Sequence, residues 1–245
     1  MIRAFYFAIV LILCYSFTAK AQQTFERDTI ATSKGTLIIT FIGHGTLMFN
    51  FNGKIIHVDP FGEQADYSLL PQADLILITH EHYDHLDVDV VKTIRTEKTK
   101  LVYSEKCAEQ IAGGIVMKNG DLKTVDGLKI EAVPAYNIVH KRGNGKPFHP
   151  KGDGNGYVIT FGDKVVYVAG DTENIPEMKA LKNIYIAFLP MNVPYTMTPE
   201  MVADAAKAFK PKILYPYHYG DTDPTKLVAL LKGVSGIEVR IRKLR

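Results

Sequence analysis

The stretch THEHYDH, at residues 79–85, places three histidines and an aspartate within six positions, in the spacing H-x-H-x-D-H. It follows a largely apolar run, residues 73–78, that is typical of a buried strand. Imidazole nitrogen and carboxylate oxygen are ligands that zinc and similar metals prefer. Histidines two positions apart face the same way only on an extended or loop backbone. The stretch predicts a metal-binding loop at a strand end. Solvated histidines at a strand exit would not explain why three of the chain's eight histidines lie here.

Three further polar residues also follow apolar runs, as ligands at strand ends should. They are Asp59 in HVDPF, Asp171 in VAGDT and His218 in YPYHYG. In order and spacing, these motifs and the histidine loop resemble the signature of the metallo-β-lactamase fold superfamily. The resemblance covers roughly residues 35–236, and among the branches it is closest to the ascorbate-6-phosphate lactonase-like and phospholipase D-like hydrolases. It implies an α/β fold, the αββα sandwich, with two mixed β-sheets flanked by helices.

The resemblance also implies a role for each motif residue. One metal position takes His80, His82 and a residue from a third motif, and the other takes Asp84, His85 and His218. Asp171 bridges the two positions. The expected catalytic residues are Asp84, which would orient the attacking hydroxide and take part in proton transfer, and Asp59, which would orient a ligand histidine through a hydrogen bond.

The third motif departs from the pattern of the family. Relatives carry a histidine after a Pro-Ala-x step, whereas PAYN at residues 134–137 places Asn137 there, and an amide oxygen is a poorer zinc ligand than imidazole. Asn137 could ligate weakly or orient water, or His140 or His149 could complete the position from the glycine-rich segment 139–156. Alternatively, the first position is weak, and the site holds one metal or a harder metal such as manganese. If the asparagine is the weak point, replacing Asn137 by histidine should tighten metal binding. His44, in GHGT, is predicted near the cleft, contacting substrate or a ligand.

Hydrophobic patterning predicts the same series of elements in both halves of the chain. Expected strands in the first half are residues 36–42, 47–51, 54–58, 101–103 and 128–133, and in the second half 157–161, 164–169, 185–189, 213–217 and 237–241. Helices are expected after Asp87, Thr198 and Asp223-Pro224. The hydrolase domain should cover residues 35–245, preceded by a loose polar leader at 22–34. Segment 139–156 is long for a connection and should lie over the metal site.

The N-terminus has the pattern of a secretory signal peptide, residues 1–21. Arg3 precedes an apolar run, and Ala19-Lys20-Ala21 has the A-x-A form of a cleavage site. The run is shorter than the ~20 residues of a membrane span, which argues against a membrane anchor. Cleavage after Ala21 would leave a periplasmic or secreted chain of net charge +1, with histidines neutral. So small a charge gives no electrostatic footprint for nucleic acid.

The favoured function is that of an exported metal-dependent hydrolase. One or two zinc ions, or manganese or iron, would supply a metal-bound hydroxide to an ester, lactone or phosphodiester in a small-molecule substrate. Basic residues of the glycine-rich segment, Lys141, Arg142, Lys146 and Lys151, would favour an anionic substrate. One alternative is a non-catalytic metal-binding module with a degraded first position. A β-lactam hydrolase is another, although Asp171 stands where zinc β-lactamases carry cysteine. A diiron redox protein is disfavoured, because such relatives place glutamate at the position of His82.

Overall fold

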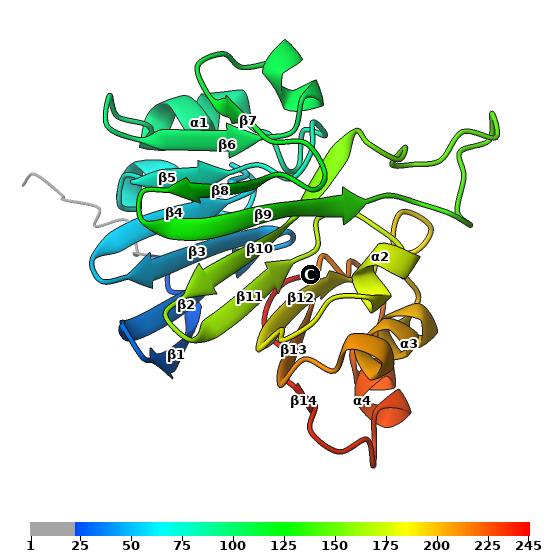
Figure 1. Ribbon diagram of the computed structural model, residues 1–245. Helices are drawn as coiled ribbons and strands as arrows, with labels where there is room; N and C mark the ends of the chain where they lie inside the picture. The colour runs from blue at the N-terminus through cyan, green and yellow to red at the C-terminus, as the bar shows by residue number, and fades with distance from the viewer. Residues whose placement is uncertain (1–22) are drawn as a thin grey trace, which may run out of the picture.

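Two seven-stranded β-sheets lie face to face in the computed structural model, which describes residues 23–245 (Figure 1). The predicted signal peptide lies outside the described residues. The first sheet contains, in spatial order, β1 (Glu26–Thr32), β2 (Gly35–Gly43), β3 (Thr46–Phe51), β4 (Lys54–Val58), β5 (Leu75–Leu77), β6 (Lys100–Tyr103) and β7 (Ile115–Val116). Its strands are antiparallel from β1 to β4 and parallel from β4 to β7.

The second sheet repeats this plan. Its members in chain order are β8 (Leu122–Val125), β9 (Leu128–Ala135), β10 (Gly154–Phe161), β11 (Lys164–Val168), β12 (Ile186–Pro190), β13 (Ile213–Tyr217) and β14 (Glu238–Val239). Pairing is antiparallel from β8 to β11 and parallel from β11 to β14. Each half therefore combines tight hairpins with parallel strands, and the carboxyl ends of the parallel strands are free to carry functional loops.

Apolar side chains from both sheets meet in one large core. Phe41 and Phe49 of the first sheet contact Phe188 of the second, and Phe188 stacks on Tyr215 with ring centroids 4.9 Å apart. A smaller cluster lies under α1 (Val88–Ile94), on the outer face of the first sheet. The predicted αββα sandwich is confirmed.

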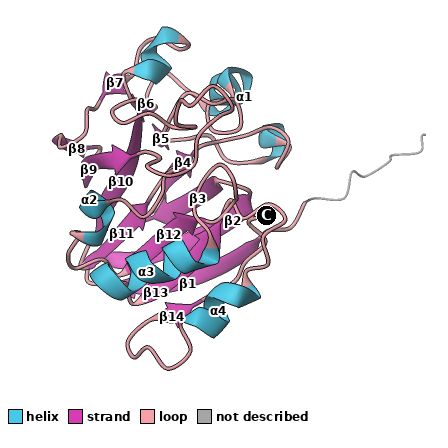
Figure 2. Ribbon diagram, turned by 90° about the vertical axis from the view of Figure 1, so that its right-hand side faces the viewer, coloured by secondary structure: helices cyan, strands magenta, loops and turns pink. Residues whose placement is uncertain are grey.

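Helices cover the outer faces of the sheets, as Figure 2 shows for α3 and α4 beside β13 and β14. The helices are α1, α2 (Pro176–Lys179), α3 (Pro199–Phe209) and α4 (Thr225–Leu230), with short 3-10 turns at Tyr67–Leu69 and Lys106–Glu109. Two predicted caps are present, since Asp87 accepts from the backbone of Asp89 and Val90, and Thr198 accepts from the backbone of Met201.

Within the predicted loose leader, residues 22–34, the described part contains an edge strand, β1. Most of β1 is exposed, so it lacks the apolar alternation of a typical strand, yet it pairs with β2 along its whole length. The carboxylate of Asp28 binds both Arg240 and Arg242 and accepts from the hydroxyl of Tyr215. Burial raises the pKa of Asp28, but these three partners outweigh it and hold the pKa below its usual value.

Other differences from the sequence-based expectation are smaller. The last strand, β14, covers Glu238–Val239 rather than residues 237–241, and β7, β8 and α2 were not predicted. These elements are two to four residues long, which is too short to show a hydrophobic period.

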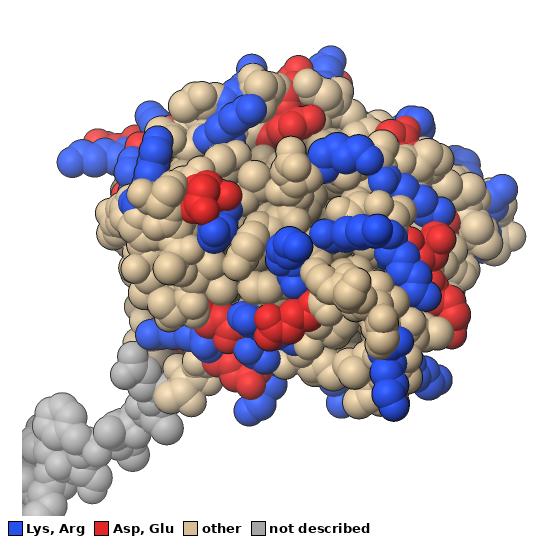
Figure 3. Space-filling view, turned by 60° about the horizontal axis from the view of Figure 1, so that its bottom comes forward, with Lys and Arg blue, Asp and Glu red and all other residues tan. Residues whose placement is uncertain are grey.

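Basic and acidic side chains are interspersed on the face drawn in Figure 3, with uncharged surface between them. This mixture agrees with the small formal net charge of the chain, +3. Among residues 23–245, no helix is long and apolar enough to cross a membrane.

Candidate metal centre

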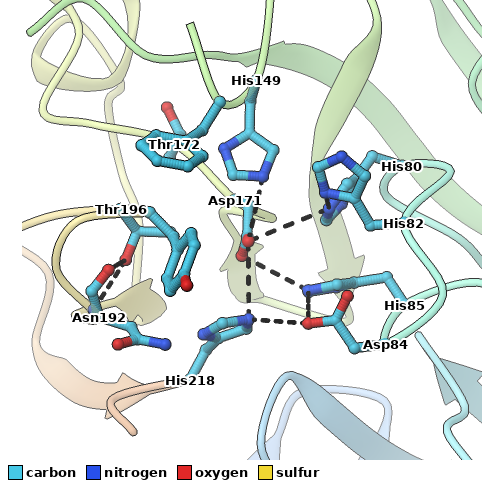
Figure 4. Close-up of polar contacts among 12 residues, drawn as sticks. His80, His82, Asp84, His85, His149, Asp171, Thr172, Asn192, Thr196 and His218 are labelled. Carbon is cyan, nitrogen blue, oxygen red and sulfur yellow. Dashed lines mark hydrogen bonds and ion pairs between the residues drawn. The ribbon is translucent and has the colours of Figure 1, made fainter. Parts of the chain in front are cut away.

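The polar motifs converge where the strands of both sheets end. The loop with the three histidines follows β5, while Asp59, Asp171 and His218 follow β4, β11 and β13. Figure 4 shows Asp171 at the middle, with His149 on one side, His218 on the other and the histidine loop facing it. Asp59 and His218 have positive φ angles of 46° and 47°, so the chain turns sharply as each strand ends.

Gly170 is the residue that allows Asp171 to enter the centre. Its φ is +64°, and a Cβ atom there would lie 2.9 Å from the carbonyl oxygen of Asn155 and 3.0 Å from Cβ of Thr79. Any larger residue would push the second sheet away from the histidine loop. At Gly170 the two sheets approach each other closely, and the next residue, Asp171, is a candidate ligand.

Three histidines form the first group of possible ligands. His80, His82 and His149 each offer a ring nitrogen within 4.8 Å of the others. Nε2 of His80 lies 3.1 Å from Nδ1 of His82, and Nε2 of His149 lies 3.3 Å from Oδ2 of Asp171. His149 comes from segment 139–156, so the structure brings one of the two candidate loop histidines into the centre.

The second group consists of His44, Asp84, His85 and His218. Oδ2 of Asp84 lies 3.4 Å from Nε2 of His218 and 3.7 Å from Nε2 of His85. Asp171 lies between the groups, with its oxygens 3.5 Å from Nε2 of both His85 and His218 and 4.0 Å from Nε2 of His80. All six residues predicted as metal ligands are thus close together, at distances that a shared pair of ions would span.

Several atoms of this cluster are buried and have no hydrogen-bond partner. Within the described residues, they include Nε2 of His85, Nε2 of His218 and Oδ1 of Asp171. Leaving such atoms unpaired is costly, and native proteins rarely do so without a ligand. All three face the same small volume, and their nitrogen and oxygen chemistry fits zinc or a similar divalent ion.

Neighbouring residues fix which ring nitrogen of each histidine faces the centre. Nδ1 of His85 lies 2.8 Å from Oδ2 of Asp59, and Nδ1 of His80 lies 3.0 Å from Oγ1 of Thr79. The Thr79 hydroxyl itself donates to Asp59. With protons on both Nδ1 atoms, the Nε2 lone pairs of His80 and His85 point inward. Asp59 therefore lies outside the cluster, where it contacts His85 directly and His80 through Thr79.

Asn137 orients the ring of His149 in the same way, through hydrogen bonds. Its Oδ1 accepts from the backbone N–H of His149 at 2.9 Å and lies 2.7 Å from Nδ1 of that ring. The other loop histidine, His140, points elsewhere, with Nδ1 2.8 Å from Oε1 of Glu173. Asn137 therefore lies behind the first group of ligands, and its side chain supports His149 instead of facing the centre itself.

Glu173 organises the backbone around Asn137. This fully buried carboxylate accepts from the backbone N–H groups of Ile138, Val139 and His140 and from the amide of Asn137. Sequence analysis missed Glu173, although it lies only two residues after Asp171. A buried carboxylate with four donors is a strong constraint, and it fixes the start of segment 139–156.

The electrostatics of the two groups differ. Burial lowers the pKa of His149 to about 4 and places that of His80 well below its usual value, so both rings are neutral and ready to ligate at pH 7. Burial also lowers the pKa of His85, but Asp171 and Asp59 outweigh it and raise the pKa to about 10. The carboxylates around His85 therefore favour a positive charge in the second group, either a proton on Nε2 or a bound cation that displaces this proton.

A cleft of about 550 Å³ opens directly onto the cluster. His44 lines it, with Nε2 3.0 Å from Oδ2 of Asp84 and its ring centroid 3.7 Å from that of His218. The predicted place of His44 near the cleft agrees with this contact. Other lining residues that sequence analysis did not single out are Phe61, Glu63, Phe148, Asn192 and Tyr195.

Replacing Asn137 is expected to weaken metal binding in the first group by about 10–100-fold, the usual cost of losing an outer partner. The structure reverses the expectation from sequence that Asn137→His would tighten it, because a histidine there lacks the Oδ1 that accepts both His149 hydrogen bonds. Zinc affinity of Asn137→Ala and Asn137→His, measured by competition with a chelating dye, checks this. Asn144→Ala, in the same segment, is the control. Tighter binding by Asn137→His would show that position 137 itself faces the metal.

Comparison with known proteins agrees with this fold and cluster. The family model described as Beta-lactamase superfamily domain matches residues 38–218. A UPF0173 metal-dependent hydrolase from Pelotomaculum thermopropionicum is 31% identical over 223 residues, covering 83% of this chain and 95% of the relative. Another from Thermococcus onnurineus is 34% identical over 203 residues, covering 76% and 86%.

Solved structures show the same relationship. A crystal structure from Parabacteroides distasonis superposes with a TM-score of 0.87 at 51% identity, covering 91% of this chain and 100% of that one. Igni18, a metallo hydrolase from Ignicoccus hospitalis, has a TM-score of 0.69 at 24% identity, covering 85% and 95%, and supports the fold alone.

Fold and cluster together define a member of the metallo-β-lactamase superfamily, and the chain belongs to it. Within that superfamily it is a metal-dependent hydrolase of the UPF0173 group.

Proposed function

We propose that this hydrolase uses two divalent ions, zinc in the first instance, to cleave an ester, lactone or phosphodiester bond in a small molecule. The observation that carries the proposal is the set of unpartnered buried atoms around Asp171 at the floor of the cleft. His80, His82 and His149 would hold one ion and Asp84, His85 and His218 the other. When bound, such ions lower the pKa of water toward ~7 and polarise a carbonyl or phosphoryl oxygen.

Asp84 is the carboxylate placed for proton transfer. Its side chain is 20% exposed and lines the cleft, whereas the side chain of Asp171 is only 4% exposed. Hydrolysis transfers the oxygen of water to the carbonyl carbon or phosphorus and a proton to the leaving oxygen. Asp84 can accept the proton from water and return it, while the ring of His44 keeps the carboxylate directed into the cleft.

Asp59 has a different role. It is fully buried, does not line the cleft, and binds His85 and Thr79. It cannot touch substrate, so it is a positioning residue that acts through the histidines.

Metal removal and a substrate panel test the proposal. We expect the purified protein to hydrolyse at least one of a set of aryl esters, lactones and phosphodiesters. Activity should disappear after dialysis against a chelator and return with zinc, manganese or iron. Metal binding without turnover on any substrate would favour a non-catalytic module, and turnover confined to β-lactams would favour an antibiotic-degrading enzyme. Undiminished turnover after complete metal removal would contradict the proposal.

We also propose that the enzyme is exported and that residues 1–21 are removed. The charged start, apolar run and A-x-A site support this. Intact-mass spectrometry of the native protein from the periplasm or medium should give a chain that begins at Gln22. A chain that retains Met1, or a cytoplasmic pool, would contradict export.

A further inference from the structure

Arg142 lines the cleft and belongs to a hydrogen-bonded turn. Its backbone N–H donates to the carbonyl of Lys146 at 2.8 Å, and the N–H of Gly145 donates back to its carbonyl at 2.9 Å. A bridge between Lys141 and Pro147 closes this small hairpin. The arginine therefore has a fixed backbone position beside the metal centre, although its side chain reaches solvent.

Two contacts direct the guanidinium group of Arg142 over the cleft. Nη2 donates to the carbonyl of Phe148 at 3.2 Å, and the guanidinium carbon lies 5.1 Å from the centre of the Phe148 ring. No carboxylate of residues 23–245 forms an ion pair with it, in contrast to Arg240 and Arg242, which share Asp28. The positive charge lines the cleft without an ion-pair partner among the described residues.

The contact between Arg142 and His82 is too long to occupy the guanidinium group. Nη2 of Arg142 lies 3.5 Å from Nε2 of His82, at the limit of a hydrogen bond. The carbonyl of Phe148, at 3.2 Å, is the nearer acceptor for this nitrogen. A guanidinium group has five N–H donors, so these two contacts leave others available to an acceptor on the substrate.

Aromatic side chains form two walls of the cleft. Phe61 and Tyr83 meet edge to face with ring centroids 5.5 Å apart, and Phe148 and Tyr195 do so at 5.1 Å. Tyr83 is 72% exposed and Tyr195 is 47% exposed. Exposed aromatic rings gathered at the mouth of a cleft are typical of a ligand site.

We infer that Arg142 binds an anionic oxygen group of the substrate beside the bond that is cleaved, while the two aromatic pairs hold an apolar part. This inference rests on the proposed hydrolase function and narrows its substrate class. The 3.5 Å approach of Arg142 to His82 places the anion next to the metal centre, so the charge lies on or close to the reacting group. The substrate is then a phosphodiester, or an ester or lactone that bears a nearby carboxylate.

Matched chromogenic substrates test this specificity. The zinc-loaded protein is assayed with mono-p-nitrophenyl glutarate, its neutral counterpart p-nitrophenyl valerate, and the phosphodiester bis-p-nitrophenyl phosphate. Arg142→Gln should lower the ratio of kcat/KM for an anionic substrate to that for the neutral ester by about tenfold or more. Lys146→Gln, which removes the same charge from the same hairpin, should leave the ratio unchanged. The anionic substrate whose kcat/KM falls more in Arg142→Gln, the glutarate or the diester, is the one whose anion the site prefers.

A binding measurement separates this inference from the hydrolase proposal. Calorimetric titration of the zinc-loaded protein with 4-phenylbutyrate and with neutral 4-phenylbutanol needs no turnover. Arg142→Gln should weaken phenylbutyrate binding about tenfold relative to phenylbutanol. If no ester or diester is hydrolysed but this shift appears, the hydrolase proposal fails and the anion site stands. Equal effects of Arg142→Gln on charged and neutral compounds, or identical behaviour of Lys146→Gln, would overturn the inference.

Discussion

Replacing Asp171 by alanine is expected to lower kcat/KM by on the order of 10³-fold or more and to reduce the bound metal below the wild-type content. Its two oxygens face Nε2 atoms of histidines from both groups, so its loss affects both metal positions. It also leaves His85 with less of the negative charge that favours a cation there. Metal content by mass spectrometry, together with hydrolysis of the best substrate from the panel, measures the effect.

The control is Asp89→Ala. Asp89 lies on the exposed side of α1, where its carboxylate pairs with Lys92. Exposed pairs of this kind contribute little to stability, and neither member of this pair lines the cleft. Circular dichroism should show both variants folded. Wild-type metal content and full activity in Asp171→Ala would refute its assignment as the bridging residue.

Replacing His149 by alanine is expected to weaken metal binding in the first position by roughly 100-fold, with a matching loss of activity at limiting zinc. Among residues 23–245, no other histidine groups with both His80 and His82, because Asn137 stands behind His149 and offers its oxygen to that ring. Calorimetric zinc titration should show one site retained near wild-type affinity and the other weakened.

His140→Ala is the matched control, since it removes a histidine from the same segment. Its ring contacts Glu173 rather than the cluster, so zinc affinity should stay within about threefold of the wild type. The reverse pattern, with His140→Ala weakening zinc and His149→Ala not, would show that the segment rearranges when metal binds.

Much of the fold could be predicted from the sequence because local pattern and tertiary structure agree in it. The hairpins 47–58 and 157–168, the capped helices and the strands that end at Asp59, Asp171 and His218 all carry their own hydrophobic period and turn residues. β1 could not be predicted in this way. Its exposed residues carry no apolar pattern, and its carboxylate Asp28 is held by arginines more than two hundred positions later.

In the candidate site, too, some residues could be predicted from local sequence and others could not. The six residues of the established motifs lie close to strand ends, so their convergence follows from the topology. The choice between Asn137, His140 and His149 depends on how segment 139–156 folds back, which Glu173 and Asn137 fix through contacts between distant parts of the chain. Sequence spacing alone cannot show which ring such a segment turns inward.

Anomalous diffraction from crystals of the zinc-loaded protein tests the central claim most directly. The account predicts two zinc ions on either side of Asp171, at the usual Zn–N distance of about 2.0–2.1 Å from ring nitrogens. The first ion should be ligated by His80, His82 and His149, and the second by Asp84, His85 and His218. A first ion ligated by Asn137 or His140 in place of His149, or zinc bound only outside this cluster, would contradict the account.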